Sequence, residues 1–493
     1  MVLLTQLPPE ILHHVLSYVA PEDLARLAYV CRDIYYFVTA NSALHQAIYL
    51  NSLDDPPTRD LNWVQELQDL VKLKRICASK DPDKESHLGF VHDTVTRLLK
   101  HAAHSGARSF PSLTYPRSRN AQLLTEAFDR LDNRHAFFCN STLFERARGS
   151  FKSIYHRPLA RKLTPEARQQ SAKLHCLYGM AVLSHGRTRS SRMYPFACSK
   201  VYDMREYTPL TRWGPFADDG TDSVDWEKVE AILIVLRANI RSKGLDNFPI
   251  FTNFWNTPFP GSWPNSYLPL PLVREISALD AQDPYDVAGT WLRVVCFLDY
   301  NDFFNYNFPG SDEPPPDVPR PALDVGEATR LILMKIHVTR IEAPEPDDGQ
   351  ELPVVYFEGF SRSLDGSWDE NANSDLRGTA RLTREGEVRW TTFSIFGGQE
   401  RWRSEGIQLG GIRSTTVVGN WFDKDYDPAG PCGPTAFWKI SDREPKSDDK
   451  QVLLNDFLPI VDGYEDEFDD DNGDGDEDVL PQYLDFEFFQ VGD

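Results

Sequence analysis

The acidic C-terminal part of the chain contains a partial match to a calcium-binding loop. Asp470, Asn472, Asp474 and Gly475 stand at the first, third, fifth and sixth positions of an EF-hand loop. The twelfth position requires a bidentate glutamate, and Pro481 occupies it here. No helical pattern flanks this stretch, and a segment so rich in like charges repels itself. We therefore expect residues 446–493 to be an acidic, largely disordered tail and not a calcium site.

Motifs for catalysis and cofactor binding are missing from the sequence. It contains no G-x-S-x-G elbow, no P-loop and no H-E-x-x-H pair. His175 and Cys176 are adjacent, but no further ligand stands at metal-binding spacing, so a packed helix or strand explains them better. We expect no catalytic residue, no metal and no cofactor, and a protein that is not itself an enzyme.

Composition and cysteine use indicate a protein of the cell interior. The chain has 493 residues, a net charge of -22 and seven scattered cysteines without a CxxC pair, which fits a reducing compartment. There is no run of about 18 apolar residues and no secretory leader, so we expect a cytoplasmic or nuclear protein without membrane contact. Residues 451–493 hold no lysine or arginine, and basic surface is not concentrated elsewhere, so nucleic-acid binding is not expected.

Tryptophan and arginine recur together in the C-terminal half. The tryptophans are Trp390, Trp402 and Trp421, and the neighbouring arginines are Arg389, Arg401 and Arg403. Because Trp and Arg dominate binding hot spots, they could line a pocket for a substrate segment; alternatively the tryptophans form the core and cap of the fold. If Trp402 is core, Arg401 and Arg403 face outward and can meet an acidic or phosphorylated segment. The three arginines are the candidate substrate-binding residues.

The elements that would position these side chains are β-strands. Eight are expected, at about 290–299, 330–338, 354–360, 376–383, 387–396, 400–409, 412–422 and 435–440. Glu385-Gly386, Gly397-Gly398 and Gly410-Gly411 punctuate consecutive strands with hairpin turns, so the pairing is antiparallel. A closed barrel and a two-sheet sandwich both remain open, and the barrel is favoured because closure removes sheet edges and leaves an interior that can hold a small group.

Helical patterns precede the strands. Apolar residues at helical spacing predict helices from Trp63 to Lys74, from Val91 to Leu99 and from Leu123 to Leu131, and a stronger one from Asp225 to Arg241. Between Phe137 and Trp213 the pattern weakens. The proline-rich, acidic stretches 309–321 and 343–353 are expected to be exposed loops.

The first 48 residues read as a small helical module. Ile11, Leu12, Val15 and Leu16 form one apolar stripe, and Pro21 restarts the chain as the first residue of a second helix. The sequence Leu7-Pro8-Pro9-Glu10-Ile11-Leu12, followed by Asp23-Leu24 and Val30-Cys31-Arg32, resembles an F-box. So small a module cannot bury all its apolar surface alone, which leaves either a partner or the rest of the chain to cover it.

The resemblance implies docking onto a Skp-type adaptor and, through it, a cullin. The residues that match the family's motif, and that it implies for adaptor binding, are Leu7, Pro8, Ile11, Leu12, Val15, Leu16, Leu24, Leu27, Val30, Cys31 and Arg32. The implied role is that of a substrate-recognition subunit of a Skp–cullin–F-box ubiquitin ligase, with an unknown protein substrate. Two alternatives stay open: a scaffold that binds the adaptor without cullin, and a lipocalin-like ligand-binding protein.

The remainder of the chain is similar to the β-rich region of fungal F-box proteins. The stretches Trp213-Gly214-Pro215-Phe216, Gly419-Asn420-Trp421-Phe422-Asp423 and Phe437-Trp438-Lys439 carry that likeness, and a weaker one links the barrel to lipocalin-like substrate domains. The expected class is α+β, a helical F-box and linker helices followed by a large antiparallel β-barrel-like domain. The expected division is 1–48 F-box, 49–135 helical linker, 136–288 mixed helix-containing region, 289–445 barrel-like domain and 446–493 tail.

Overall fold

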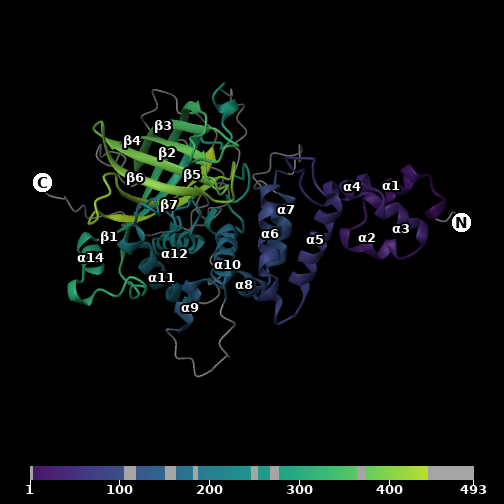
Figure 1. Ribbon diagram of the computed structural model, residues 1–493, viewed down its shortest axis with the longest axis horizontal. Helices are drawn as coiled ribbons and strands as arrows, with labels where there is room; N and C mark the ends of the chain where they lie inside the picture. The colour runs from purple at the N-terminus through teal and green to yellow at the C-terminus, as the bar shows by residue number, and fades with distance from the viewer. Residues whose placement is uncertain are drawn as a thin grey trace, which may run out of the picture.

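The computed structural model describes residues 4–104, 118–149, 163–180, 187–245, 254–266, 277–363 and 373–441. Helices come first and a closed β-barrel follows, so the predicted α+β class is confirmed. The N-terminal module lies at one end, helices α5 to α7 lead away from it, and the barrel stands over helices α10 to α12 at the other end (Figure 1). The predicted tail, including its partial calcium loop, lies outside the described residues.

The N-terminal module consists of four short helices, α1 (Pro9–Ser17), α2 (Pro21–Ala28), α3 (Arg32–Thr39) and α4 (Ser42–Ser52). Pro9 and Pro21 each open a helix, where the missing proline N–H costs little. The Asn41 side chain accepts a hydrogen bond from the Leu44 amide and caps α4. The helical reading of this segment is therefore correct.

The connecting helices are α5 (Trp63–Ala78), α6 (Leu88–Lys100), α7 (Arg119–Phe128) and α8 (Leu131–Phe138). Asn62 and Ser118 cap the first and third of these. The prediction of one helix reaching from Leu123 to Leu131 is wrong, because α7 ends at Phe128 and Leu131 begins α8. The helical spacing of apolar residues continues across the break between α7 and α8, so the sequence pattern did not reveal the break.

A second helical layer lies under the barrel. It comprises α9 (Thr142–Gly149), α10 (Pro165–Tyr178), α11 (Arg187–Val201) and α12 (Trp226–Ser242). The predicted helix 225–241 is α12, and it packs against β1, β2, β7 and β8. The stretch in which the helical pattern weakened contains α9 to α11. Its periodicity is blurred because the second half of α10 is buried on every side and Pro195 interrupts α11.

The β-domain is a closed barrel in which each strand pairs antiparallel with the next and β8 closes onto β1. The strands are β1 (Gly289–Leu298), β2 (Glu327–Glu342), β3 (Val354–Ser363), β4 (Ser374–Leu382), β5 (Val388–Phe396), β6 (Gln399–Gln408), β7 (Thr416–Asp423) and β8 (Cys432–Ser441). All eight predicted strands are found. Of the two predicted architectures, the closed barrel is correct and the two-sheet sandwich is wrong.

Both faces of the barrel are buried over much of their area. Trp291, Trp390, Phe357 and Phe437 pack together inside, with ring centroids 5.2–5.6 Å apart, and they fill the part of the interior that they line. The outer face of β1, β6, β7 and β8 is apolar as well and joins the helical layer in one core. The layer and the barrel are therefore packed as a single body.

Between β1 and β2 lies a helix that the sequence reading missed, α14 (Tyr300–Asn307). The loop 309–321 follows it and is exposed over most of its length, as predicted, but Arg320 near its end is buried. Shorter 3-10 turns are η1 (Leu4–Gln6), η2 (Lys84–His87), η3 (Met204–Glu206), η5 (Asp280–Gln282) and η6 (Gly310–Asp312). Among the described helices, none has the length and apolar character to cross a membrane.

Candidate partner-binding surfaces

The eleven residues expected to bind an adaptor divide between the core and the surface of the N-terminal module. Leu12, Leu16 and Leu24 are buried in the chain's own core, so they shape the module and offer no surface of their own. Leu7, Leu27 and Cys31 are half-buried and pack against that core. The exposed members are Pro8, Ile11, Val15, Val30 and Arg32.

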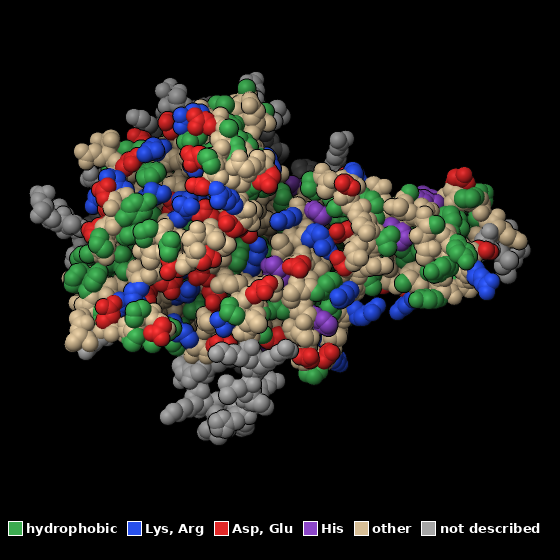
Figure 2. All heavy atoms as spheres, in the orientation of Figure 1, with side chains coloured by type: hydrophobic (Ala, Val, Ile, Leu, Met, Phe, Trp, Pro, Cys, Tyr) green, Lys and Arg blue, Asp and Glu red, His purple; other side chains and the backbone are tan. Residues whose placement is uncertain are grey.

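Further exposed apolar side chains lie on the same module as Pro8, Ile11, Val15 and Val30. Ile11 is 49% exposed and Val15 is 44% exposed, on the side of α1 next to the buried Leu12 and Leu16. Tyr18, Tyr29, Tyr35 and Tyr36 add exposed aromatic rings from three segments of the module. We call these residues, with Pro8 and Val30, the module face. Figure 2 shows hydrophobic side chains gathered at this end of the molecule.

The predicted arginine site contains a buried ion-pair network. Glu405 on β6 is fully buried, and it accepts hydrogen bonds from Arg389 at 2.8 Å and from Arg403 Nη2 at 2.5 Å. The Thr391 hydroxyl adds a third donor, at 3.0 Å from Oε2. Burial alone would raise the pKa of Glu405, but the two guanidinium groups outweigh it and hold that pKa below its usual range. Two of the three predicted arginines thus serve the fold.

The third arginine lies at the surface. Arg401 is exposed, and its guanidinium carbon is 5.1 Å from the centroid of the Trp402 ring. Trp402 is half-buried and packs edge-to-face on Trp421 at 5.2 Å, whereas Trp390 is enclosed in the barrel. The reading of the tryptophans as core and cap matches this arrangement. A substrate-binding role for the arginines stays a prediction. Of the three arginines, Arg401 is the one whose side chain is exposed.

His175 and Cys176 lie in α10 and are buried, as a packed helix requires. His175 Nδ1 lies 2.6 Å from Glu230 Oε1, and the Cys176 thiol points to the Trp226 carbonyl. Burial raises the pKa of the Cys176 thiol well above its usual range, so the thiolate is disfavoured. Within the described ranges, no group of three or more His, Cys, Asp or Glu side chains could hold a metal ion.

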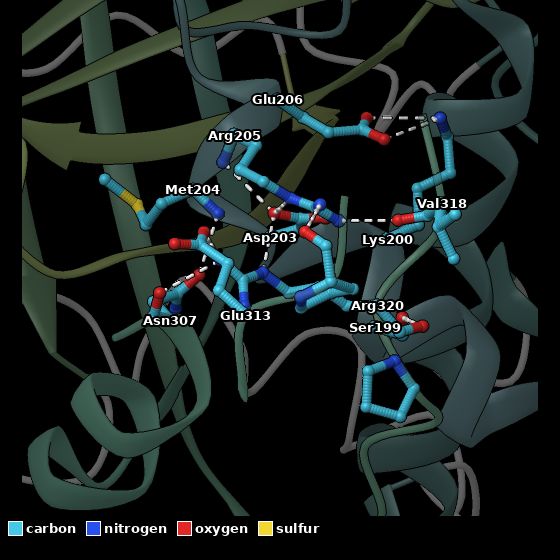
Figure 3. Close-up of polar contacts among 12 residues, drawn as sticks. Ser199, Lys200, Asp203, Met204, Arg205, Glu206, Asn307, Glu313, Val318 and Arg320 are labelled. Atoms are coloured by element: carbon cyan, nitrogen blue, oxygen red, sulfur yellow. Dashed lines mark hydrogen bonds and ion pairs between the residues drawn. The ribbon is translucent and has the colours of Figure 1, made fainter. Parts of the chain in front are cut away.

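A second buried charge network was not foreseen from the sequence. Arg205 and Arg320 both reach Asp203, at 2.7 Å and 3.0 Å, from segments more than 100 residues apart (Figure 3). The carboxylate is buried and lies at the end of the helical layer, where the loop 309–321 returns. Arg205 stands only two residues from Asp203, but Arg320 is brought to it by the tertiary fold, so the sequence does not reveal the network. The same two arginines also donate to backbone carbonyls of α14 and of the loop behind it.

Comparisons with known proteins apply to the N-terminal module alone. Neither the curated proteins nor the solved structures include a match to this chain. Residues 4–51, which span helices α1 to α4 almost completely, match a protein-family model described as F-box-like. The N-terminal module of this protein is therefore an F-box-like domain.

Proposed function

We propose that this protein is the substrate-recruiting subunit of a Skp–cullin–F-box ubiquitin ligase. The observation that carries the proposal is the module face, an exposed apolar surface on the F-box-like domain. Soluble proteins seldom expose contiguous apolar patches unless a partner covers them. The adaptor is the partner that this domain family implies.

The arrangement of the molecule supports a receptor role. The F-box-like domain lies at one end, and the barrel with its helical layer lies at the other (Figure 1). A receptor that holds a substrate away from the adaptor raises the effective concentration of substrate lysines near the ubiquitin-charged enzyme. The ubiquitin transfer itself would be catalysed elsewhere in the complex. The proposal places the protein inside the cell, in the cytoplasm or the nucleus.

The experiment compares two double variants of the full chain for co-purification with adaptor and cullin. Ile11→Asp with Val15→Asp puts two charges on the module face, and we expect adaptor binding to weaken by at least about 30-fold, as loss of interface anchors commonly does. Leu210→Asp with Ile412→Asp is the matched control, because those residues are 51% and 42% exposed elsewhere on the chain. The control should bind like the wild type.

Three outcomes separate the candidate functions. Adaptor and cullin recovered together with the wild type, and lost with the module-face variant, support the ligase subunit. Adaptor without cullin indicates a scaffold. If neither adaptor nor cullin is recovered, both the ligase subunit and the scaffold are refuted. The remaining candidate is then a lipocalin-like ligand-binding protein.

A further inference from the structure

Exposed large apolar side chains gather at two places in the described part of the chain. One is the module face, and the other is α14 with the loop behind it. The second group consists of Tyr300, Phe304, Phe308 and Val318. Figure 1 places α14 at the end of the molecule away from the F-box-like domain, and Figure 2 shows hydrophobic side chains over that region. The proposed adaptor site leaves this second surface without a role.

Three of these residues form a continuous row along α14 and its C-terminal cap residue, Phe308. Tyr300, Phe304 and Phe308 follow one another at intervals of four residues and are 51%, 42% and 42% exposed. Their ring centroids are 6.1 Å and 4.8 Å apart along the row. We call this row the aromatic stripe. Phe303 and Asn307, on the inner side of the helix, are buried, so the helix keeps its own core contacts without using the stripe.

The stripe is held in place from behind by the Asp203 network. Arg320 donates to the carbonyl oxygens of Tyr306 and Asn307, at 3.0 Å and 2.9 Å, and so fixes the C-terminal end of α14. Arg205 donates to the carbonyl oxygens of Pro315 and Val318, at 3.0 Å and 3.2 Å, and so fixes the loop (Figure 3). A surface fixed in this way loses little conformational freedom on binding, which favours affinity.

The segment that carries the stripe is acidic. Exposed carboxylates in the same segment are Asp299, Asp302, Asp317 and Asp324. The only basic residue of the sequence from 299 to 324 is Arg320, which is buried and bound to Asp203 and Glu313. A partner that covers the stripe must therefore meet apolar rings and negative charge together, and basic groups beside its apolar side chains would complement both.

From this juxtaposition we infer that the aromatic stripe is a docking site for a partner segment that carries aromatic or aliphatic side chains next to lysine or arginine. The apolar side chains lie along Tyr300, Phe304 and Phe308, and the basic ones face the surrounding carboxylates. This mode resembles the way an amphipathic segment packs its apolar face against a complementary surface. The inference deepens the proposed function, since it makes that segment part of the recruited substrate.

The test begins with a library of random 12-residue peptides displayed against the full chain. We expect the selected peptides to combine apolar residues with lysine or arginine, and their affinity to fall as salt is raised. Phe304→Ser with Phe308→Ser should weaken the best peptide by at least about tenfold. Leu210→Ser with Ile412→Ser, at exposed apolar residues outside the stripe, should leave it unchanged.

Photo-crosslinking identifies the occupant. Benzoylphenylalanine in place of Phe304 in the full chain should crosslink to the selected peptide and lose that product when unlabelled peptide is added. Crosslinks to a second copy of the chain, or to residues 442–493 of the same chain, would overturn the inference by naming another occupant. Failure to select any binder, selection of acidic peptides, or an unchanged affinity in Phe304→Ser with Phe308→Ser would overturn it as well.

The two proposals fail separately. Loss of adaptor and cullin recovery would refute the ligase role while the peptide measurements still decide whether the stripe binds. An intact adaptor complex with no peptide binding would refute the stripe alone. In that case the predicted arginine site, with Arg401 as its exposed residue, remains the candidate surface for substrate binding.

Discussion

Glu405 gives two of the three arginines predicted to bind substrate, Arg389 and Arg403, a structural role. On the strand pattern, Arg403 faces outward with Arg401, but the pairing of β5 with β6 is irregular at Arg401 and interrupts that alternation. The sequence could not show that Glu405 would be buried under the segment 213–216, where a side chain added at Gly214 would meet Glu405 Cβ at 2.8 Å. The charges of Arg389 and Arg403 are consequently committed to Glu405. Burial of Glu405 by a distant segment, and not the strand pattern, decides that these arginines are structural.

Replacing Glu405 tests this assignment. We expect Glu405→Gln to lower the free energy of unfolding by about 3–5 kcal/mol, because it leaves two largely buried guanidinium groups without their counter-charge. Equilibrium denaturation in urea measures the change. The control is Glu400→Gln, at the more exposed pair of Glu400 with Arg377, which should cost less than about 1 kcal/mol. Equal losses in both variants would refute the structural role.

The same carboxylate has a defined effect on acid stability. Its pKa in the folded chain lies below the unfolded value, so the folded state binds this proton more weakly. The stabilisation is therefore complete above the unfolded pKa and is lost as the pH falls through the folded pKa. Glu405→Gln should show a smaller loss of stability between neutral and acid pH than the wild type does, in the same urea measurements.

Strands were easier to predict from the sequence than helices, for a physical reason. Alternation in Ile332, Met334, Ile336 and Val338, with glycines at the turns, locates a strand and its neighbours without tertiary information. Helix α10 is buried on both sides over its second half, so its apolar residues no longer form a stripe. Helix α14 was missed because its apolar residues divide between the core at Phe303 and the solvent at Phe304.

The Asp203 network makes a prediction at the level of α14 and its loop. Asp203→Asn removes the charge that Arg205 and Arg320 share, and we expect faster amide hydrogen exchange in residues 300–321 and a loss of about 3 kcal/mol in the free energy of unfolding. Hydrogen-exchange mass spectrometry measures the local effect. Asp55→Asn, at an exposed pair with Arg59, should change neither quantity. Unchanged exchange at 300–321 would show that other contacts fix the stripe.

On the scale of the whole molecule, the helical layer and the barrel share one core. The barrel's outer face contributes Leu292, Val294, Ile407, Val418 and Trp438, all buried against the helical side. From the sequence, the barrel at 289–445 was expected as a domain distinct from the mixed region 136–288. The sequence located the strands but could not show that their outward side chains would also be buried, since an apolar residue on a strand does not reveal which element covers it.

This shared core predicts that the barrel does not fold alone. A fragment of residues 277–445 would expose the outer apolar face, and we expect it to aggregate or to bind an apolar dye without a cooperative unfolding transition. A fragment of residues 53–445 lacks the F-box-like domain but keeps α5 to α12 and should unfold cooperatively. Circular dichroism melting and dye fluorescence on both fragments measure the difference. A barrel fragment that stays monomeric and melts cooperatively would show that the division at residue 289 separates independent domains, and that the helices merely cover a finished barrel.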